Sequence, residues 1–304
     1  MKVEAECVAC ILSRAAAETT EATTNPALRF RAMTDLLRLL TKEFTPSAVP
    51  ADLGTKRDRL ISRVTGNNDP YKRSKRISNE KALKLLPYAR KIVEAGYTQE
   101  DRFKKACLVA IVGNVMELDI PGHKFTSTTL RKNIREAAQD LAIDDASRIY
   151  ELAKKANTVL YLTDNAGEIV FDTLLVEQLK NMGVKVITAV KGGPVINDAT
   201  LEDAEASGMS KVADKVITTG TNTVGLAVKE VSAEFLDVYN SVDLVFAKGM
   251  GYAETLTELK LKKPHVLLFR TKCNPVANFF GVSREKNVAK LMPWTVSATR
   301  LISV

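Results

Sequence analysis

The spacing of apolar residues changes its period near the middle of the chain. Through residue 156, apolar side chains recur at the spacing that places them on one face of a helix. No two-residue alternation and no internal repeat is found in this half. It is therefore predicted to be an all-α helical domain, with helices over residues 26–40, 79–95, 98–115, 127–141 and 145–156.

From Asn157 onward, short apolar runs alternate with amphipathic segments. The runs are rich in β-branched residues, and a helix is predicted after the first of them, over residues 168–181. This alternation is typical of βαβ units. We predict an α/β fold with a doubly wound, mainly parallel sheet in an α/β/α, Rossmann-like arrangement. The helical cap would span residues 1–156 and the α/β core residues 157–304. The predicted strands are residues 159–162, 184–190, 215–218, 244–247 and 266–269.

Composition and charge narrow the class of protein. Apolar residues make up 45% of the chain and charged residues 26%, as in ordinary globular proteins. The first 155 residues hold 28 Lys and Arg against 20 Asp and Glu, which accounts for the whole net charge of +8. A basic half favours partners that carry phosphate. Aromatic residues are sparse and the densest basic run, residues 72–76, is short, so solvated helix faces explain most of these charges better than nucleic acid does.

Two further features of the sequence bear on cellular location and membrane association. No run of about 18 apolar residues occurs, so no segment is expected to span a membrane. The first ten residues carry acids where a signal peptide would be basic and apolar. We therefore expect a cytoplasmic protein without a membrane partner, and the sequence predicts no particular oligomeric state.

Polar residues and glycines follow every predicted strand. Right-handed crossovers place the carboxyl ends of parallel strands at one edge of a sheet, where ligands bind. Oxygens of Asp164, Asn165 and Asp198 would hold a divalent metal ion there. An Asp-Asn pair before a helix is by itself more often an N-cap, so this prediction depends on all five loops together. An anion would be held by Lys248 and by the amides of Gly167, Asn222 and Gly249. Metal plus anion binding is the layout of phosphoryl transfer to water.

Other chemistries fit less well. The chain has neither the P-loop pattern nor a G-x-G-x-x-G after the first strand, which disfavours a P-loop nucleotidase and a dinucleotide oxidoreductase. Its two histidines lack partners at metal-ligand spacing. One alternative is a nucleotide- or RNA-binding protein without catalytic activity, which would use the basic half and tolerate loss of Asp164 and Asp198. A less favoured alternative is an adenosyl-cofactor methyltransferase, although Lys191 stands where such a protein would place an acid.

A few residues of the first half are not explained by helix packing. Cys7 and Cys10 form a C-x-x-C on one helix face. Two small buried residues are the simpler interpretation, and a redox pair, or a metal pair joined by Cys273, is the alternative. Arg14 lies one turn beyond Cys10, and a Gly-Asn pair at 113–114 interrupts an apolar helix.

The motifs at the strand ends resemble, in combination, those of one family. They are T-D-N-A-G-E at 163–168, K-G-x-P with N-D-A-T at 191–200, T-G-T-N at 219–222 and K-G-M-G-Y-x-E at 248–254. They resemble the domain of unknown function 89 family, the metal-dependent damage-control phosphatases. The C-x-x-C at 7–10, N-D-P-Y-x-x-x-K at 68–75 and G-N at 113–114 are similar to its stand-alone prokaryotic and archaeal branch.

The resemblance implies an α/β/α core with a helical domain over the strand ends, and a site at that edge. It implies Mg²⁺, Mn²⁺, Co²⁺ or Ni²⁺ on Asp164, Asn165 and Asp198, with Lys248 on the substrate phosphate. The implied substrates are phosphate esters of sugars and nucleotides, including damaged metabolites. In the mechanism that we expect, a metal-bound water molecule or Asp164 itself attacks the phosphoryl group. Asn114, Asp69 and Asn222 would reach in from the cap and neighbouring loops, and Glu168 and Glu254 are candidate supporting acids.

Overall fold

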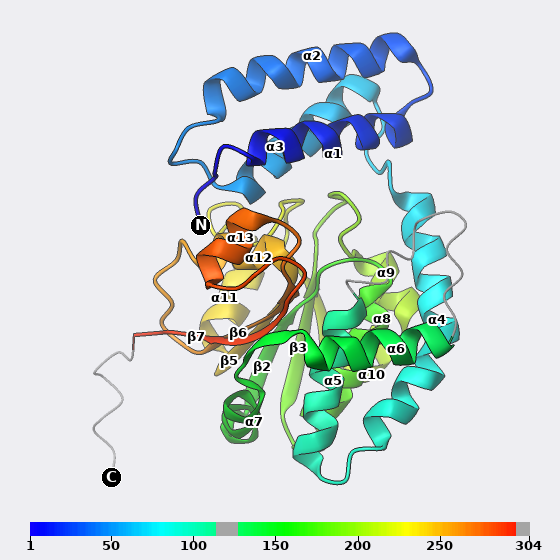
Figure 1. The fold of residues 1–304 in the computed structure, drawn as a ribbon, viewed down its shortest axis with the longest axis vertical. Helices are drawn as coiled ribbons and strands as arrows, with labels where there is room; N and C mark the ends of the chain where they lie inside the picture. The colour runs from blue at the N-terminus through cyan, green and yellow to red at the C-terminus, as the bar shows by residue number, and fades with distance from the viewer. Residues whose placement is uncertain (114–126, 296–304) are drawn as a thin grey trace.

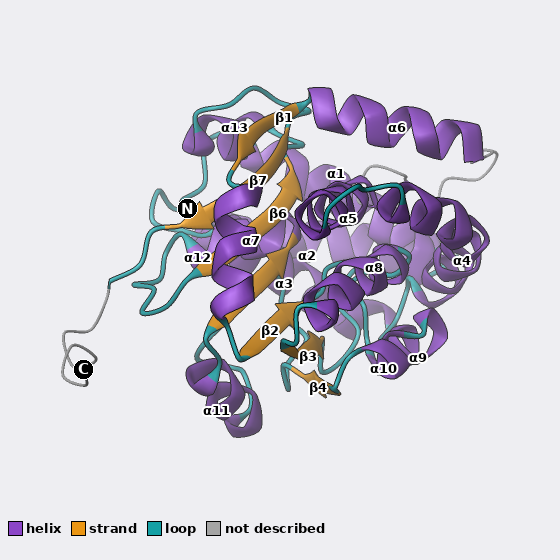
Figure 2. Cartoon of the chain, turned by 90° about the horizontal axis from the view of Figure 1, so that it is seen from below, coloured by secondary structure: helices purple, strands orange, loops and turns teal. Residues whose placement is uncertain are grey.

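The computed structural model describes residues 1–113 and 127–295 of the 304-residue chain. Within these residues, seven strands form one sheet in the order β1-β7-β6-β5-β2-β3-β4 (Figures 1 and 2). Only β6 and β7 pair antiparallel, and every other neighbouring pair is parallel. The strands are β1 (Leu141–Asp144), β2 (Thr158–Leu162), β3 (Lys185–Val190), β4 (Lys215–Thr218), β5 (Leu244–Lys248), β6 (His265–Arg270) and β7 (Asn287–Met292).

The predicted mainly parallel α/β fold is confirmed, and its five predicted strands correspond to β2–β6. Two strands were not predicted. β1 has only four residues and lies between the helices expected over 127–141 and 145–156. The first of them, α6 (Ser127–Gln139), ends two residues earlier than predicted. The sequence does not predict β7, because the polar Lys290 interrupts its apolar run. β7 pairs with β6, the strand before it in the chain, whereas β1 pairs only with β7, about 145 residues further along.

Helices cover both faces of the sheet (Figure 2). One face and its helices share an apolar cluster that includes Phe103, Tyr161, Phe171 and Phe246. The other face shares a second cluster that includes Leu160 and Phe235. The helices that contribute to the first cluster are α4 (Lys72–Glu94), α5 (Gln99–Gly113), α6, α7 (Ala146–Lys155), α8 (Glu168–Asn181), α9 (Leu201–Ser207) and α10 (Met209–Val212). Those of the second are α11 (Ala233–Ser241), α12 (Gly249–Leu256) and α13 (Asn274–Phe280).

Three helices at the start of the chain form a separate layer above the strand ends (Figure 1). They are α1 (Cys7–Ala22), α2 (Pro26–Glu43) and α3 (Pro50–Thr65). Their apolar faces pack on one another around Ile11, Leu36 and Ile61, in a cluster distinct from those of the sheet. Pro26 and Pro50 stand at the first turn of α2 and α3, where a missing N–H costs nothing. The cap expected over the strand ends is thus built from α1–α3, while α4, α5 and α7 pack against the sheet.

The division into domains at residue 156 stays a prediction. None of the helices in the described ranges is long and apolar enough to cross a membrane.

Candidate active site

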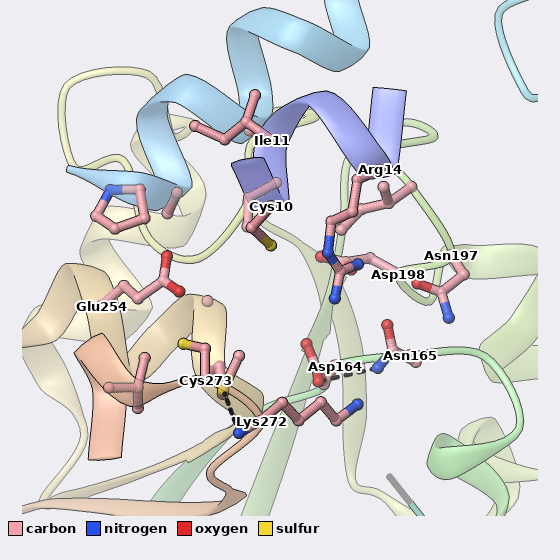
Figure 3. A pocket seen from close by; sticks show the side chains of 18 of the residues that line it. Cys10, Ile11, Arg14, Asp164, Asn165, Asn197, Asp198, Glu254, Lys272 and Cys273 are labelled. Atoms are coloured by element: carbon pink, nitrogen blue, oxygen red, sulfur yellow. Dashed lines mark hydrogen bonds between the residues drawn. The ribbon is translucent and has the colours of Figure 1, made fainter. Parts of the chain in front are cut away.

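A cavity of about 500 Å³ lies between the carboxyl ends of the strands and the helices α1 and α3 (Figure 3). It opens where β2 has β3 on one side and β5 on the other. Loops diverge at such a switch point, and this is where open α/β sheets bind ligands. Its lining includes Asp164, Asn165 and Glu168 after β2, Asn197 and Asp198 after β3, and Met250 and Glu254 after β5. The lining also includes Lys272 and Cys273 after β6, and Cys10 and Arg14 of α1.

Backbone hydrogen bonds join the loops after β2 and β3. Asn165 and Asp198 form an isolated β-bridge. The Ala199 amide donates to the Asp164 carbonyl at 2.8 Å, and the Ala166 amide donates to the Asn197 carbonyl at 2.9 Å. These bonds bring Asp164, Asn165 and Asp198 to one side of the cavity (Figure 3). The structure therefore places the three predicted metal ligands together.

The carboxylate of Asp164 lies directly over Gly249. A Cβ atom at position 249 would fall 1.9 Å from Asp164 Oδ2, so only glycine fits beneath this side chain. Gly249 also has a φ of 82°, which other residues rarely adopt. The side-chain NH₂ group of Asn165 donates to Asp164 Oδ2 at 3.0 Å and to Glu168 Oε1 at 2.6 Å. Position 249 thus serves Asp164 and the turn into α12, and does not face the cavity as a predicted anion ligand would.

Without a bound cation, the surroundings of Asp164 disfavour the ionised form of its carboxyl group. Burial raises its pKa well above the ordinary value, and the nearby carboxylates of Glu168 and Asp198 raise it further. Lys248 and Lys272 oppose this shift without cancelling it. Burial likewise raises the pKa of Asp198 to about 6, against the opposing charge of Lys191.

Two buried lysines lie beneath these carboxylates. Lys248 Nζ is 3.2 Å from Asp172 Oδ1 and 3.4 Å from Glu168 Oε2, and its side chain is 1% exposed. Burial lowers the pKa of Lys248, but Asp172, Glu168 and Asp164 more than reverse this and leave the pKa raised. Lys191 Nζ donates to the Gly225 carbonyl at 2.8 Å and lies 3.5 Å from Asp198 Oδ2. Both lysines neutralise carboxylates from below the cavity.

The exposed cations of the cavity come from other segments. Arg14 extends from α1, and Lys272 extends from the loop after β6 toward Asp164 and Asn165 (Figure 3). Lys272 was not among the predicted site residues. Its place just after the fifth predicted strand is the signal that could have identified it. Helix packing alone does not explain Arg14, and its place in the cavity does.

Several predicted phosphate-binding groups have other partners. The Gly167 amide donates to Asn79 Oδ1 at 2.7 Å. Asn222 lies at the edge of the sheet, where Arg59 donates to its Oδ1 at 2.9 and 3.2 Å. Asp69 Oδ2 is 3.5 Å from Lys75 Nζ. Neither Asn222 nor Asp69 lines the cavity, so both would act on the site only through their neighbours.

Of the Gly-Asn pair at 113–114, the structure describes only Gly113. Gly113 lines the cavity, and a Cβ there would lie 3.3 Å from the Glu168 Cα and from the Phe171 ring. The close packing of α5 on α8 therefore explains the glycine. Asn114 lies outside the described residues.

The donor set agrees with a divalent metal ion bound partly by substrate. Among the residues that the structure describes, no three or more His, Cys, Asp and Glu side chains converge as a complete metal site. Mg²⁺ is commonly bound by one or two carboxylates plus substrate oxygens and water. Asp164 and Asp198 supply two carboxylates, and Asn165 adds an amide. Burial and neighbouring carboxylates raise the pKa values of Asp164 and Asp198. A bound cation would favour the ionised form of both side chains, so the residues fit such an ion.

The thiols of Cys7, Cys10 and Cys273 line one part of the cavity. Cys7 is buried, but Cys10 is exposed, so burial does not explain the C-x-x-C spacing. Burial raises the pKa of both Cys7 and Cys273. Cys273 lines the same cavity as the pair, which the less favoured metal alternative requires. The redox and metal interpretations stay predictions.

Known proteins resemble this chain over nearly its whole length. A protein of Methanocaldococcus jannaschii described as uncharacterized is 37% identical over 295 residues, covering 95% of each chain. A damage-control phosphatase of Archaeoglobus fulgidus is 36% identical over 96% of this chain and 100% of its own length. A damage-control phosphatase of Pyrococcus horikoshii is also 36% identical, over 93% of this chain and 96% of its own.

Structure and family comparisons agree with these relatives. A crystal structure of a domain of unknown function 89 family protein from Pyrococcus horikoshii matches with a TM-score of 0.86 and 35% identity, covering 96% of this chain and 99% of that one. The family model described as damage-control phosphatase ARMT1-like domain matches residues 3–288. The resemblance noted in the sequence is thereby confirmed, and the chain belongs to the damage-control phosphatase ARMT1-like domain family.

Proposed function

We propose that this phosphatase depends on a divalent metal ion and hydrolyses small phosphomonoesters, including damaged phosphometabolites. One observation carries the proposal. The carboxylates of Asp164 and Asp198, whose pKa values are raised, face the same cavity as the exposed cations Arg14 and Lys272. A metal ion would bind the first pair and a phosphate group would bind the second, which brings the reacting groups together.

Asp164, Asp198 and Asn165 would hold the metal ion. In the structure Asn165 turns its NH₂ group toward Asp164 and Glu168. Rotating the amide by half a turn presents its oxygen instead, and the carboxylates favour that orientation once a cation lies between them. When bound, the ion supplies charge to a phosphoryl oxygen and lowers the pKa of a water molecule. Mg²⁺, Mn²⁺, Co²⁺ and Ni²⁺ are the candidates.

The exposure and contacts of four further side chains suggest their roles. Arg14 and Lys272 would bind the non-bridging phosphate oxygens and offset the charge that develops on them. Lys248, for which the sequence resemblance implied this role, would act through Glu168 and Asp172, because it is buried against both. Glu168 lines the cavity and is held by Asn165 and Lys248, so it is placed to accept a proton from attacking water. Attack by Asp164 itself is the other route.

Phosphate release from p-nitrophenyl phosphate tests the proposal. The protein is assayed after chelation and then with each of the four metal ions, beside Asp164→Asn and Asp198→Asn. Loss of a metal ligand should lower kcat/KM about 10³-fold, as expected for loss of several kcal/mol of transition-state stabilisation. Asp237→Asn, an exposed carboxylate on α11, is the matched control and should retain activity.

Full activity after chelation would contradict the metal dependence. No release with any metal, or unchanged release by both Asp variants, would overturn the proposed site. Retained binding of RNA or nucleotides by Asp164→Asn, without hydrolysis by the wild type, would instead favour a binding protein.

A further inference from the structure

Each of the two loops that carry the predicted metal ligands contains one left-handed residue. Gly167, two residues after Asn165, has a φ of 81°. Ile196, two residues before Asp198, has a φ of 41°. Positive φ is strained for a β-branched residue, so the conformation at Ile196 must be held by its surroundings.

In both loops, a side chain from the helices binds the amide of that residue. Asn79 Oδ1 of α4 accepts from the Gly167 N–H at 2.7 Å. Asp58 Oδ1 of α3 accepts from the Ile196 N–H at 3.0 Å. Asn79 and Asp58 are 4% and 6% exposed, so water does not replace either bond readily. The same arrangement therefore occurs twice, from two different helices.

Asn79 is itself fixed by its second hydrogen bond. Its Nδ2 donates to Asp203 Oδ1 at 2.8 Å. Asp203 Oδ2 accepts from the Thr200 amide and hydroxyl at the start of α9, at 2.9 and 2.8 Å, and lies 3.4 Å from Lys75 Nζ. Position 79 must both accept and donate, which an amide side chain does and a carboxylate does not. This explains an Asn in the segment that follows the N-D-P-Y motif.

Asp58 is held from its own side of the cavity. It is buried, and the Glu18 carboxyl group of α1 lies nearby. Arg57 Nε, on the preceding residue, donates to Glu18 Oε2 at 2.9 Å. This buried ion pair attaches α3 to α1 next to the acceptor for Ile196.

We propose that Asn79 and Asp58 are positioning residues for the metal site. They hold the loops after β2 and β3 in the conformations that turn Asp164, Asn165 and Asp198 toward one another. The inference rests on the proposed function for the identity of the ligand, but not for the geometry of the loops. The competing interpretation is that the two bonds only attach the helices to the sheet.

A third bond between helix and loop provides a matched control. The Val224 amide donates to Thr55 Oγ1 of α3 at 2.9 Å, and its loop carries none of the predicted metal ligands. Thr55→Val removes this bond at nearly constant volume. If the bonds only attach the helices, Thr55→Val, Asn79→Ala and Asp58→Ala should act alike.

The test measures Mn²⁺ affinity by calorimetry, amide hydrogen exchange at Gly167 and Ile196, and stability to urea. We expect Asn79→Ala and Asp58→Ala to weaken Mn²⁺ binding about 10–100-fold, the usual effect of losing a group that orients a ligand. Each should speed exchange at its own amide. Thr55→Val should leave Mn²⁺ affinity unchanged even where it lowers stability.

Milder variants keep the test decisive if an alanine variant fails to fold. Asp58→Asn retains an acceptor and should preserve Mn²⁺ affinity, whereas Asn79→Asp places a second carboxylate against Asp203 and should not. Equal weakening by Thr55→Val, or unchanged affinity and exchange in all variants, would overturn the inference. Absence of Mn²⁺ binding by the wild type would contradict the proposed function instead, and the exchange rates would still decide whether the loops are positioned.

Discussion

The cavity has two sets of positive charges that are held in different ways. Beneath it, Lys191 and Lys248 are 1% exposed and are packed against carboxylates at the strand ends. Facing it, Arg14 and Lys272 are exposed and come from α1 and from the loop after β6. We call the first set the buried lysines and the second the exposed cations. A buried charge must be paired to offset its desolvation, so the buried lysines maintain the shape of the site and the exposed cations remain accessible to a ligand.

The largest expected contrast lies between one lysine of each set. Lys248→Met leaves Glu168 and Asp172 without their buried partner and should destabilise the protein by about 3–5 kcal/mol. Lys272→Met should change stability by no more than about 0.5 kcal/mol, as for most surface positions. It should instead raise KM for a phosphate ester about 10–100-fold, the equivalent of one charged hydrogen bond.

Urea unfolding and steady-state kinetics of the two variants measure this contrast. A stable Lys248→Met protein with a raised KM would show that Lys248 contacts the phosphate. Unchanged kinetics of Lys272→Met would remove Lys272 from the site.

The next effect concerns the support beneath Asp164. In Gly249→Ala the new Cβ would meet Asp164 Oδ2 at 1.9 Å, so the carboxylate must move by an ångström or more. A displacement of that size can lower kcat/KM about 10²-fold. Gly183→Ala is the matched control, because Gly183 has the same φ of 82° and no atom within 4 Å of the added Cβ.

Both glycine variants should lose about 1–2 kcal/mol of stability from backbone strain. Only Gly249→Ala should lose activity on p-nitrophenyl phosphate. Equal activities would show that the position of Asp164 does not depend on Gly249.

The smallest effect is the pH dependence of metal binding. The pKa of Asp198 is about 6, so above pH 6 its carboxylate is ionised and binds metal without losing a proton. Below pH 6 the metal must displace that proton, and Mn²⁺ affinity should fall about tenfold per pH unit. The raised pKa of Asp164 extends the dependence to higher pH.

Calorimetry between pH 5 and 8, in buffers of different ionisation enthalpy, measures both affinity and protons released. An affinity that is constant over this range would mean that carboxylates with raised pKa values do not hold the metal.

Much of the fold and part of the site followed from the sequence. The change in apolar period identified β2–β6 and the mainly parallel sheet, since β-branched runs between helices have few other solutions. Asp164, Asn165 and Asp198 could be grouped from the sequence because the carboxyl ends of parallel strands share one edge. A helical layer over this edge was also expected, and α1–α3 form the layer that lies there.

Only the tertiary structure decided the remaining features, because they depend on residues far apart in the sequence. β1 exists through its pairing of Leu141 with Asn287, and no local pattern reveals that partner. Lys248 and Lys272 both follow a strand, and packing alone makes one a buried ion-pair partner and leaves the other open to the cavity. Asn79 meets Gly167 across 88 residues of chain. Sequence periodicity thus determined which residues reach the edge of the sheet, and long-range packing determined which of them a ligand can touch.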